Sequence, residues 1–134
     1  MINEITSTQA YQALANEPDA VLIDCRTKEE WQLLGTPDLS GVGKRAVLIE
    51  WQDFQGRVNE DFCDQVEDVT DTDCPVYVIC RSGGRSRSAC EALINFGFEQ
   101  CFNLKDGFDG KLNDKGQRGK IEGWQVSDLP WTQG

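Results

Sequence analysis

Three short apolar runs and one partly polar strand-like stretch, separated by stretches of helical periodicity, set the strongest limit on how this chain can fold. The apolar runs cover residues 20–24, 46–51 and 76–80, and the partly polar stretch covers 100–104. Apolar runs of this length are typical of strands that are buried on both faces of a parallel sheet. Parallel neighbours need crossover connections, which are right-handed and usually helical. The alternation therefore predicts an α/β fold whose mostly parallel sheet is covered by helices on both sides.

Capping patterns predict where two of the connecting helices begin. Thr6 and Thr27 each stand three residues before a Gln or Glu, which is the spacing of a capping box. We expect the first helix to end near Asn16 and the second to end at Gly35. Residues 36–45 are expected to form a loop, because they contain one proline and two glycines.

Apolar stripes predict two further helices. Between residues 50 and 79 nine acidic residues face one basic residue, but Phe62, Val66 and Val69 recur at helical spacing. The acidic residues are therefore interpreted as the solvated face of a helix and not as a binding site. A last helix follows residue 80, with apolar residues at 89, 90, 93 and 94, and is expected to end at Gly97.

The chain is expected to form one domain, 1–134, because no repeat or interdomain linker interrupts the sequence. Residues 105–123 are polar, rich in glycine and without helical or strand periodicity. A connection of this length is either a lid over a functional site or a mobile tail section, and we favour the tail section. Trp124, Leu129 and Trp131 are expected to return the end of the chain to the body of the domain.

Composition excludes several classes of function. A formal charge of −10 repels phosphate backbones and anionic bilayers, so neither nucleic acid nor a membrane is an expected partner. No apolar run approaches the roughly 20 residues that cross a bilayer, and no signal peptide is evident, so the expected location is cytoplasmic. Histidine is absent from the sequence, which excludes Ser-His-Asp and Cys-His catalysis. The spacing of the six cysteines matches no zinc motif, and we expect no metal or cofactor.

Cys80 stands in unusual surroundings for a cysteine. Most cysteines of a reducing compartment are small, buried, apolar filler. Cys80, however, ends an apolar run and is followed by two glycines and a helix, so that backbone N–H groups and the positive end of the helix converge near the thiol. Arg81, Arg85 and Arg87 add three cations, which is unfavourable at a helix N-terminus unless an anion binds there. The segment therefore predicts a thiolate beneath an anion-binding loop.

Three stretches resemble the rhodanese family of sulfurtransferases. The loop Cys-Arg-Ser-Gly-Gly-Arg-Ser at 80–86, after an apolar strand, resembles the active-site loop of that family. The stretch Leu-Ile-Asp-Cys-Arg-Thr-Lys-Glu-Glu-Trp at 22–31 resembles its N-terminal signature, and residues 97–107 resemble the run after its catalytic helix. The match covers most of 5–131, with the motifs in the family's order and spacing.

The resemblance implies a three-layer α/β/α sandwich around a five-stranded, mostly parallel sheet, in which the strand ending at Asp24 lies beside the strand ending at Cys80. It also implies a thiosulfate sulfurtransferase-like enzyme, in which Cys80 takes a sulfane sulfur from a donor, becomes a persulfide and passes the sulfur to a thiophilic acceptor. Asp24 and Arg26 match the family's Asp-x-Arg and would anchor the loop. The residues that would hold the donor and the persulfide are Arg81, Ser82, Gly83, Gly84, Arg85 and Ser86.

Two positions depart from the pattern of that family. Residues 35–41 lack the histidine of its Gly-His-Ile-Pro-Gly-Ala segment, on which the chemistry does not depend. Cys25 stands where a branched aliphatic residue is common, and it should lie near the same edge of the sheet as Cys80. We favour a packing role for Cys25. The sharper hypothesis is that Cys25 is a resolving thiol for oxidised or persulfidated Cys80, which the persulfide lifetime in Cys25→Ser would test.

Two other functions are weighed against sulfur transfer. The active-site loop of a cysteine-dependent phosphatase or arsenate reductase has the pattern Cys-x5-Arg, whereas Cys80 to Arg85 is Cys-x4-Arg. This shorter loop suits a single sulfur atom better than a phosphoryl group. The other alternative is a non-catalytic rhodanese-like module with a regulatory or sulfur-carrier role. Non-enzymatic or regulatory modules typically lack the cysteine, whereas Cys80 is present within an intact loop. The expected partners of the enzyme are a small anionic sulfur donor and a thiol or cyanide acceptor, and a persulfide-donor protein is a further candidate.

Overall fold

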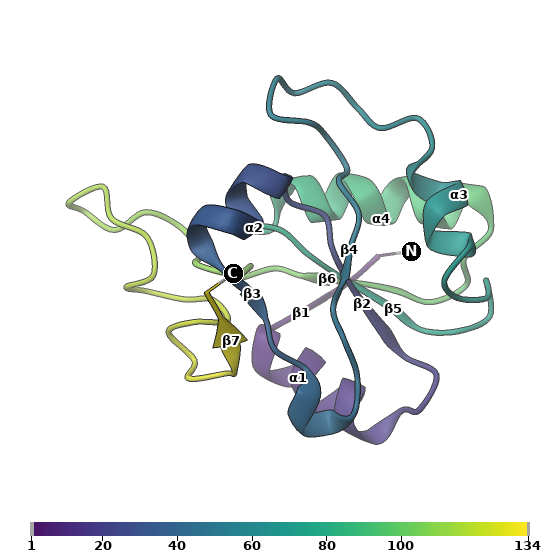
Figure 1. Cartoon of the computed structure of the whole chain (residues 1–134), viewed down its shortest axis with the longest axis horizontal. Helices are drawn as coiled ribbons and strands as arrows, with labels where there is room; N and C mark the ends of the chain where they lie inside the picture. Colours follow the sequence, from purple (N-terminus) through teal and green to yellow (C-terminus); the bar gives the residue numbers. More distant parts are fainter. Residues whose placement is uncertain (1, 134) are drawn as a thin grey trace.

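The computed structural model describes residues 2–133. A five-stranded sheet in the order β1-β6-β5-β2-β4 lies at the centre, and all of its neighbouring strands run parallel (Figure 1). Its strands are β1 (Asn3–Ile5), β2 (Val21–Asp24), β4 (Val47–Leu48), β5 (Val76–Ile79) and β6 (Cys101–Leu104). A separate antiparallel pair joins β3 (Thr36–Pro37) to β7 (Trp131–Thr132). The predicted α/β fold with a five-stranded parallel sheet is confirmed.

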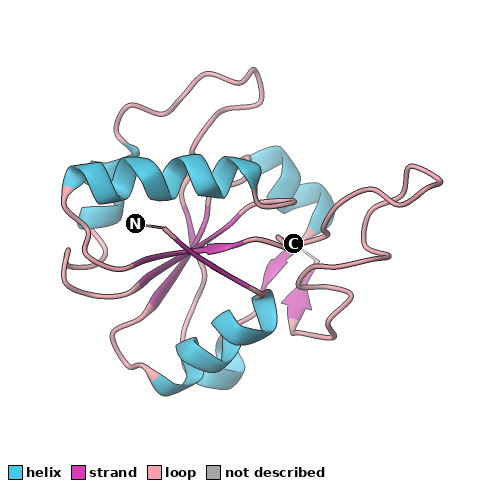
Figure 2. Cartoon of the chain, turned by 180° about the vertical axis from the view of Figure 1, so that it is seen from behind, coloured by secondary structure: helices cyan, strands magenta, loops and turns pink. Residues whose placement is uncertain are grey.

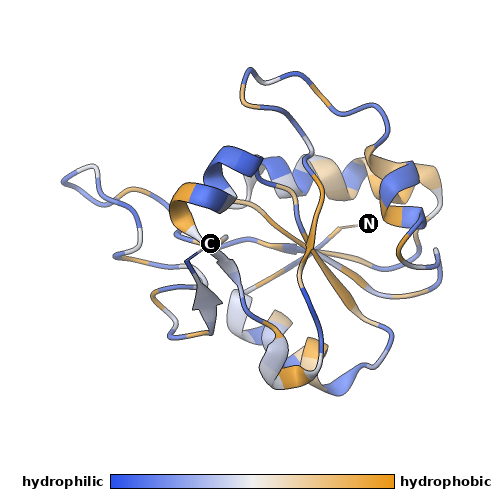
Figure 3. Cartoon of the chain, in the orientation of Figure 1, coloured by the Kyte–Doolittle hydropathy of each residue, from blue (hydrophilic) through white to orange (hydrophobic). Residues whose placement is uncertain are grey.

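Helices cover both faces of the sheet, with the strands between them (Figure 2). Successive residues of β5 face opposite layers, because Val78 packs in the cluster that contains α3 (Phe62–Glu67) and α4 (Gly84–Phe96), whereas Tyr77 packs in the cluster that contains α1 (Ser7–Asn16). The 3-10 helix η1 (Ser40–Val42) lies with α1, and α2 (Lys28–Leu34) follows β2. Figure 3 shows apolar residues concentrated in the strands at the middle of the molecule, whereas the outer loops are mostly polar.

Both predicted capping boxes are present. The side chains of Thr6 and Thr27 accept from the N–H groups of Gln9 and Glu30, each across 3.2 Å, and both N-cap N–H groups donate to the returning side chains. The second helix ends at Gly35, as predicted. Glu30, which takes part in the cap of α2, also faces the loop after β5 and forms an ion pair with Arg85 there.

The register of β2 and β5 places their carboxyl ends side by side. Asp24 pairs with Ile79, and the N–H of Cys25 donates to the carbonyl oxygen of Ile79 across 3.0 Å. The residues that follow the two strands, Cys25 and Cys80, therefore lie at the same edge of the sheet, as the resemblance implied. Ligand sites of parallel α/β sheets lie at this edge.

Three elements differ from the sequence-based expectations. β1 has no apolar run because it is an edge strand whose first two residues are exposed. Only Val47–Leu48 of the run 46–51 is a strand, although the N–H groups of Ile49 and Trp51 still bond to the chain after β2, at the carbonyls of Asp24 and Cys25. Residues 36–45 contain β3 and η1, because the chain end folds back to pair with β3.

The segment 105–123 contains no helix or strand, as predicted, but its first part is not a mobile tail section. Asp106, Phe108 and Asp109 are buried, and backbone hydrogen bonds join 107–110 to the loop after β5. Trp124 is buried and returns the chain to the body of the domain, as expected. Among residues 2–133 no helix has the length and apolar character needed to cross a membrane.

Candidate active site

Cys80 lies directly after β5, at the start of the loop that leads into α4. Only 1% of the residue is exposed, and the N–H of Gly83 donates to its Sγ across 3.1 Å. Gly83 has a φ of +99°, and a Cβ atom there would lie 2.5 Å from the carbonyl oxygen of Lys105. A side chain is therefore excluded at this turn, and glycine is what allows a backbone donor to point at the sulfur.

The N-terminus of α4 faces the same sulfur. The helix runs for 13 residues from Gly84, and its first N–H groups have no partners within the helix. The partial positive charge of that end favours an anion near Cys80. Ser82 and Gly84 line the pocket above the thiol, so the structure brings these predicted residues together with it.

Ser86, in the first turn of α4, contacts the sulfur but does not line the pocket. Its Oγ is 3.2 Å from the Sγ of Cys80 and makes a short hydrogen bond to Oδ1 of Asn103, in β6. Ser86 and Asn103 are buried. Nothing in the sequence singles out Asn103, because a single polar residue within an apolar strand is common and none of its neighbours points to the loop.

The segment 105–110 forms the wall behind the loop. The N–H of Phe108 donates to the carbonyl of Cys80 across 2.8 Å, and the N–H of Gly110 donates to the carbonyl of Arg81 across 2.9 Å. Gly107 has a φ of +68°, and a Cβ atom there would collide with the carbonyl oxygen of Arg81. The glycine-rich segment therefore fixes the backbone on which Cys80 is placed.

Asp24 and Arg26 support this wall from beneath. Their side chains are completely buried and form an ion pair, with Nη2 of Arg26 2.7 Å from Oδ2 of Asp24. The same Nη2 donates to the carbonyl of Gly35 across 2.8 Å, and the guanidinium lies 4.2 Å from the centre of the Phe108 ring. Because Phe108 holds the carbonyl of Cys80, the contacts link the predicted Asp-x-Arg pair to the loop.

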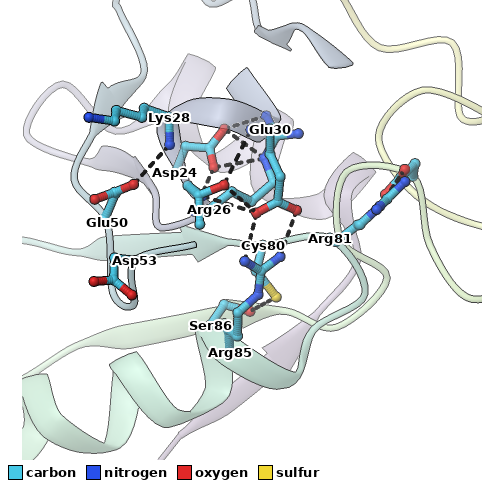
Figure 4. A network of polar contacts seen from close by, with 12 residues as sticks. Asp24, Arg26, Lys28, Glu30, Glu50, Asp53, Cys80, Arg81, Arg85 and Ser86 are labelled. Atoms are coloured by element: carbon cyan, nitrogen blue, oxygen red, sulfur yellow. Dashed lines mark hydrogen bonds and ion pairs between the residues drawn. The ribbon is translucent and has the colours of Figure 1, made fainter. Parts of the chain in front are cut away.

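Each of the three arginines has a carboxylate partner, and Figure 4 shows Arg85 facing Glu30. Arg85 binds Glu30 through two hydrogen bonds of 2.7 and 2.9 Å. Arg81 binds Asp109 across 2.9 Å, and Arg87 points away to Glu4. The partners Asp109 and Glu4 were not identified from the sequence. The positive charge offered to a ligand is therefore partly neutralised within the protein.

The ion pair between Glu30 and Arg85 shifts the pKa values of both groups. Burial alone would raise the pKa of Glu30, but hydrogen bonds from Arg85 and from Thr27 outweigh burial and hold it at about 2. The hydrogen bonds from Arg85 to Glu30 likewise raise the pKa of Arg85, against the opposing effect of its burial. The pair is therefore charged at every pH at which the protein is expected to work.

Acid should lower the free energy of unfolding by protonating the carboxylate of Glu30. The folded pKa of about 2 lies below the ordinary value of 4.5, so the contribution is complete above about pH 5 and is lost as the pH falls towards 2. Linkage with allowance for partial solvent exposure gives about 2 kcal/mol. Urea unfolding across this range should show that much less acid-induced loss in Glu30→Gln than in the wild type. The exposed Glu99→Gln should behave like the wild type, and parallel pH profiles for all three proteins would contradict the prediction.

A pocket of about 780 Å³ opens above Cys80. Leu33 and Phe54 stand on its rim with 76% and 75% of their surface exposed. Arg118 lines it and donates to the carbonyl of Gly110 across 2.7 Å, so the segment 105–123 contributes a side chain to the site. Its full lining is Thr27, Glu29, Glu30, Leu33, Leu34, Gln52, Asp53, Phe54, Gly56, Cys80, Arg81, Ser82, Gly84, Arg85 and Arg118.

Other thiols lie in the core around Cys80 but away from the pocket lining. Cys25 is completely buried, and burial raises its pKa well above the ordinary value. Burial also raises the pKa of Cys90 and raises that of Cys101 to about 11. These groups are therefore protonated near neutral pH. Cys80 is the only cysteine among the lining residues of the pocket in the described chain 2–133.

Comparison with known proteins gives consistent matches along the chain. A family model described as the STR4 middle domain matches residues 3–134. An uncharacterised protein of Rickettsia conorii is 36% identical over 132 residues, with 97% of each chain covered. A protein of Allochromatium vinosum named sulfurtransferase is 31% identical over 107 residues, which are 80% of this chain and 85% of that protein.

Two further matches concern a larger protein and a solved structure. The chloroplastic rhodanese-like domain-containing protein 4 of Arabidopsis thaliana is 26% identical over 133 residues, which are 96% of this chain but 25% of that protein. The crystal structure of Rv0390 from Mycobacterium tuberculosis has a TM-score of 0.91 and 40% identity, and the match covers 98% of both chains. The similarity thus extends over the whole domain and includes the loop after β5.

Proposed function

The chain belongs to the rhodanese-like family of sulfurtransferases, and we propose that it transfers a sulfane sulfur from a donor such as thiosulfate to a thiophilic acceptor through a persulfide on Cys80. The observation that carries this proposal is the position of Cys80. Its sulfur lies at the base of a pocket, accepts from the N–H of Gly83 and faces the N-terminus of α4. A thiolate and an attached anionic sulfur would both be stabilised there.

In the first half-reaction, the Cys80 thiolate attacks the sulfane sulfur of thiosulfate. A bond forms between Sγ and that sulfur, the sulfur–sulfur bond of the donor breaks, and its electron pair leaves with sulfite. In the second half-reaction, cyanide or a thiolate attacks the outer sulfur of the persulfide. The persulfide bond breaks and its electron pair returns to Sγ as a thiolate, so the enzyme needs no redox cofactor for a complete cycle.

Backbone donors have the larger role in holding the transferred charge. Arg81 and Arg85 line the pocket, but each shares its charge with a carboxylate, so their part is to shape the site and attract the donor over a short range. The N–H of Gly83 and those of the first turn of α4 stay available to sulfur. Such preorganised donors need no reorganisation as negative charge moves from the donor to the leaving sulfite.

Phosphoryl transfer receives less support from the same contacts. A cysteine phosphatase needs a guanidinium that grips the oxygens of the phosphoryl group. Arg85, the nearest counterpart, is engaged through both terminal nitrogens with Glu30. A regulatory module without catalysis has no use for a buried thiol aligned with a backbone donor. Sulfur transfer is therefore the function that these residues favour.

The resolving role of Cys25 stays a prediction. Cys25 lies at the correct edge of the sheet, but a buried thiol whose pKa is raised is a weak nucleophile at neutral pH. We propose the cytoplasm as the location, since reduced thiols persist there and all six cysteines are free.

Intact-mass measurement tests the proposal directly. Wild-type protein incubated with thiosulfate is expected to gain the mass of one sulfur atom, and later addition of cyanide should restore the original mass while thiocyanate appears in solution. A protein that gains no sulfur from thiosulfate or from glutathione persulfide would contradict the proposed function. Turnover with one donor and not the other would identify the preferred donor class.

A further inference from the structure

A chain of buried polar groups runs from Cys80 through the sheet to its edge strand. Sγ of Cys80 is 3.2 Å from Oγ of Ser86, which bonds in turn to Oδ1 of Asn103. Nδ2 of Asn103 donates to the carbonyl of Gly83 across 3.1 Å and to the carboxylate of Glu4 across 3.0 and 3.1 Å. Ser86 and Asn103 are 0% and 1% exposed, so water does not compete for the hydrogen bond between them.

The two acceptors of Nδ2 fix the orientation of the Asn103 amide. Glu4 lies opposite Asn103 in the parallel pairing of β1 with β6, and the Gly83 carbonyl lies on the loop above. A rotated amide would place Oδ1 against a carboxylate and a carbonyl, neither of which has a hydrogen to donate. Oδ1 therefore points to Ser86, and Oδ1 is also only an acceptor.

The hydroxyl hydrogen of Ser86 cannot serve both Asn103 and the sulfur of Cys80. A serine hydroxyl has one hydrogen, and Asn103 requires it. Ser86 can then present only a lone pair to Cys80. A thiol fits this arrangement, because its S–H donates to Ser86 while Sγ accepts from Gly83. A thiolate keeps the hydrogen bond from Gly83 but loses the contact with Ser86, since it would face the oxygen lone pair unless the Ser86 hydrogen turned away from Asn103 and left Oδ1 buried without a partner.

We propose that Asn103, held by Glu4, is a positioning residue that keeps the Ser86 hydrogen away from Cys80 and so favours the thiol over the thiolate in the resting enzyme. The inference rests on the proposed function only in that Cys80 is the reacting thiol. When Sγ is deprotonated or carries a second sulfur, Ser86 must exchange Asn103 for the sulfur. Losing the hydrogen bond to Asn103 therefore disfavours deprotonation of Cys80 when no donor is bound. It also favours transfer of the outer sulfur from the persulfide to an acceptor, after which Ser86 can bond to Asn103 again.

Other ionisable groups face Cys80 and are unchanged by the test below. Cys25 approaches from the end of β2, and Arg85 and Cys90 approach from α4. Arg85 is paired with Glu30 of α2, and Arg81 of the loop is paired with Asp109. The variants alter Asn103, Ser86 or Glu4, so any common background from these groups cancels in the comparison.

Alkylation of Cys80 by iodoacetamide measures its thiolate without requiring sulfur transfer. The alkylation rate is measured as a function of pH. The mass of the peptide that contains Cys80 shows that this residue is the one modified. Asn103→Leu removes the amide and frees the Ser86 hydrogen for the thiolate. The pH at half-maximal rate should then fall by about one unit, with about tenfold faster alkylation at neutral pH, because one hydrogen bond to a charged group is gained. Asn95→Leu, at an exposed position of α4, should match the wild type.

A double-variant cycle decides whether the shift passes through Ser86. In Ser86→Ala, addition of Asn103→Leu should leave the pH profile unchanged. Glu4→Ala, which lets the amide turn, should shift the profile in the same direction as Asn103→Leu but by less. Because Glu4→Ala also removes a negative charge, its shift counts only after subtraction of the shift that Glu4→Ala causes in the Ser86→Ala background. Melting curves identify folded variants, and partly exposed Glu4 carries the test if Asn103→Leu does not fold. An unshifted profile in the folded variants, or a shift that persists without Ser86, overturns the proposal, and neither result depends on which sulfur donor the enzyme uses.

Discussion

Cys80→Ser is expected to gain no sulfur from thiosulfate under conditions in which the wild type gains one atom. A hydroxyl at this position is a poor nucleophile towards sulfane sulfur, and its product would lack the sulfur–sulfur bond of a persulfide. The loss should be complete because each of the proposed half-reactions passes through this sulfur. Intact mass after thiosulfate treatment measures it, and the substitution is small enough for the variant to keep the fold.

The other cysteines provide the controls for this experiment. Cys63 and Cys74 are partly exposed, so they are the thiols that adventitious reagents would reach first. Replacing both with serine should leave sulfur loading unchanged, since neither lines the pocket. If Cys80→Ser gained the same mass as the wild type, or if the double variant lost the gain, the reactive thiol would have been assigned wrongly.

The sheet was predictable from the sequence because its central strands are buried on both faces. β2 and β5 leave nearly continuous apolar runs, β6 is apolar apart from Asn103, and two capping boxes mark the helices between strands. The edge strands were less predictable for the same physical reason. β1 exposes Asn3 and Glu4 to solvent and so leaves no run, and β4 is only two residues long.

The thiol of the candidate site was predictable because one continuous stretch contains the strand end, the glycine turn and the helix start. Its partners were not, because they lie far away in the sequence. Asn103 and Asp109 reach the loop only through the pairing of β5 with β6 and the turn that follows. Glu30 was predicted as a helix cap, and its second role as the partner of Arg85 depends on the distance between two helices.

The arginines show how folding changes the meaning of a sequence pattern. Three cations at a helix N-terminus suggested a strongly positive site for an anionic donor. In the folded chain each of them meets a carboxylate, with Asp109, Glu30 and Glu4 as the partners. Under the proposed function, we therefore expect backbone N–H groups to hold an anionic donor more than net charge does. A neutral or singly charged persulfide donor should then serve as well as thiosulfate.

Arg26→Met should destabilise the protein by about 3–5 kcal/mol, because it leaves the buried charge of Asp24 without a partner. The exposed pair of Arg57 with Asp53 offers the matched control, and Arg57→Met should leave the free energy of unfolding nearly unchanged. Urea unfolding at neutral pH measures both variants. Adding Asp24→Leu to Arg26→Met should recover part of the loss, since the double variant buries no charge.

The same substitution should also reach the reacting thiol, because the Arg26 guanidinium stacks on Phe108 and Phe108 holds the carbonyl of Cys80. Sulfur loading by folded Arg26→Met should therefore be slower than in the wild type even under conditions in which both proteins are fully folded. Arg57→Met should load at the wild-type rate. If Arg26→Met costs no more stability than Arg57→Met, the buried pair does not support the fold, and if its folded fraction loads sulfur normally, the loop is held by its backbone hydrogen bonds alone.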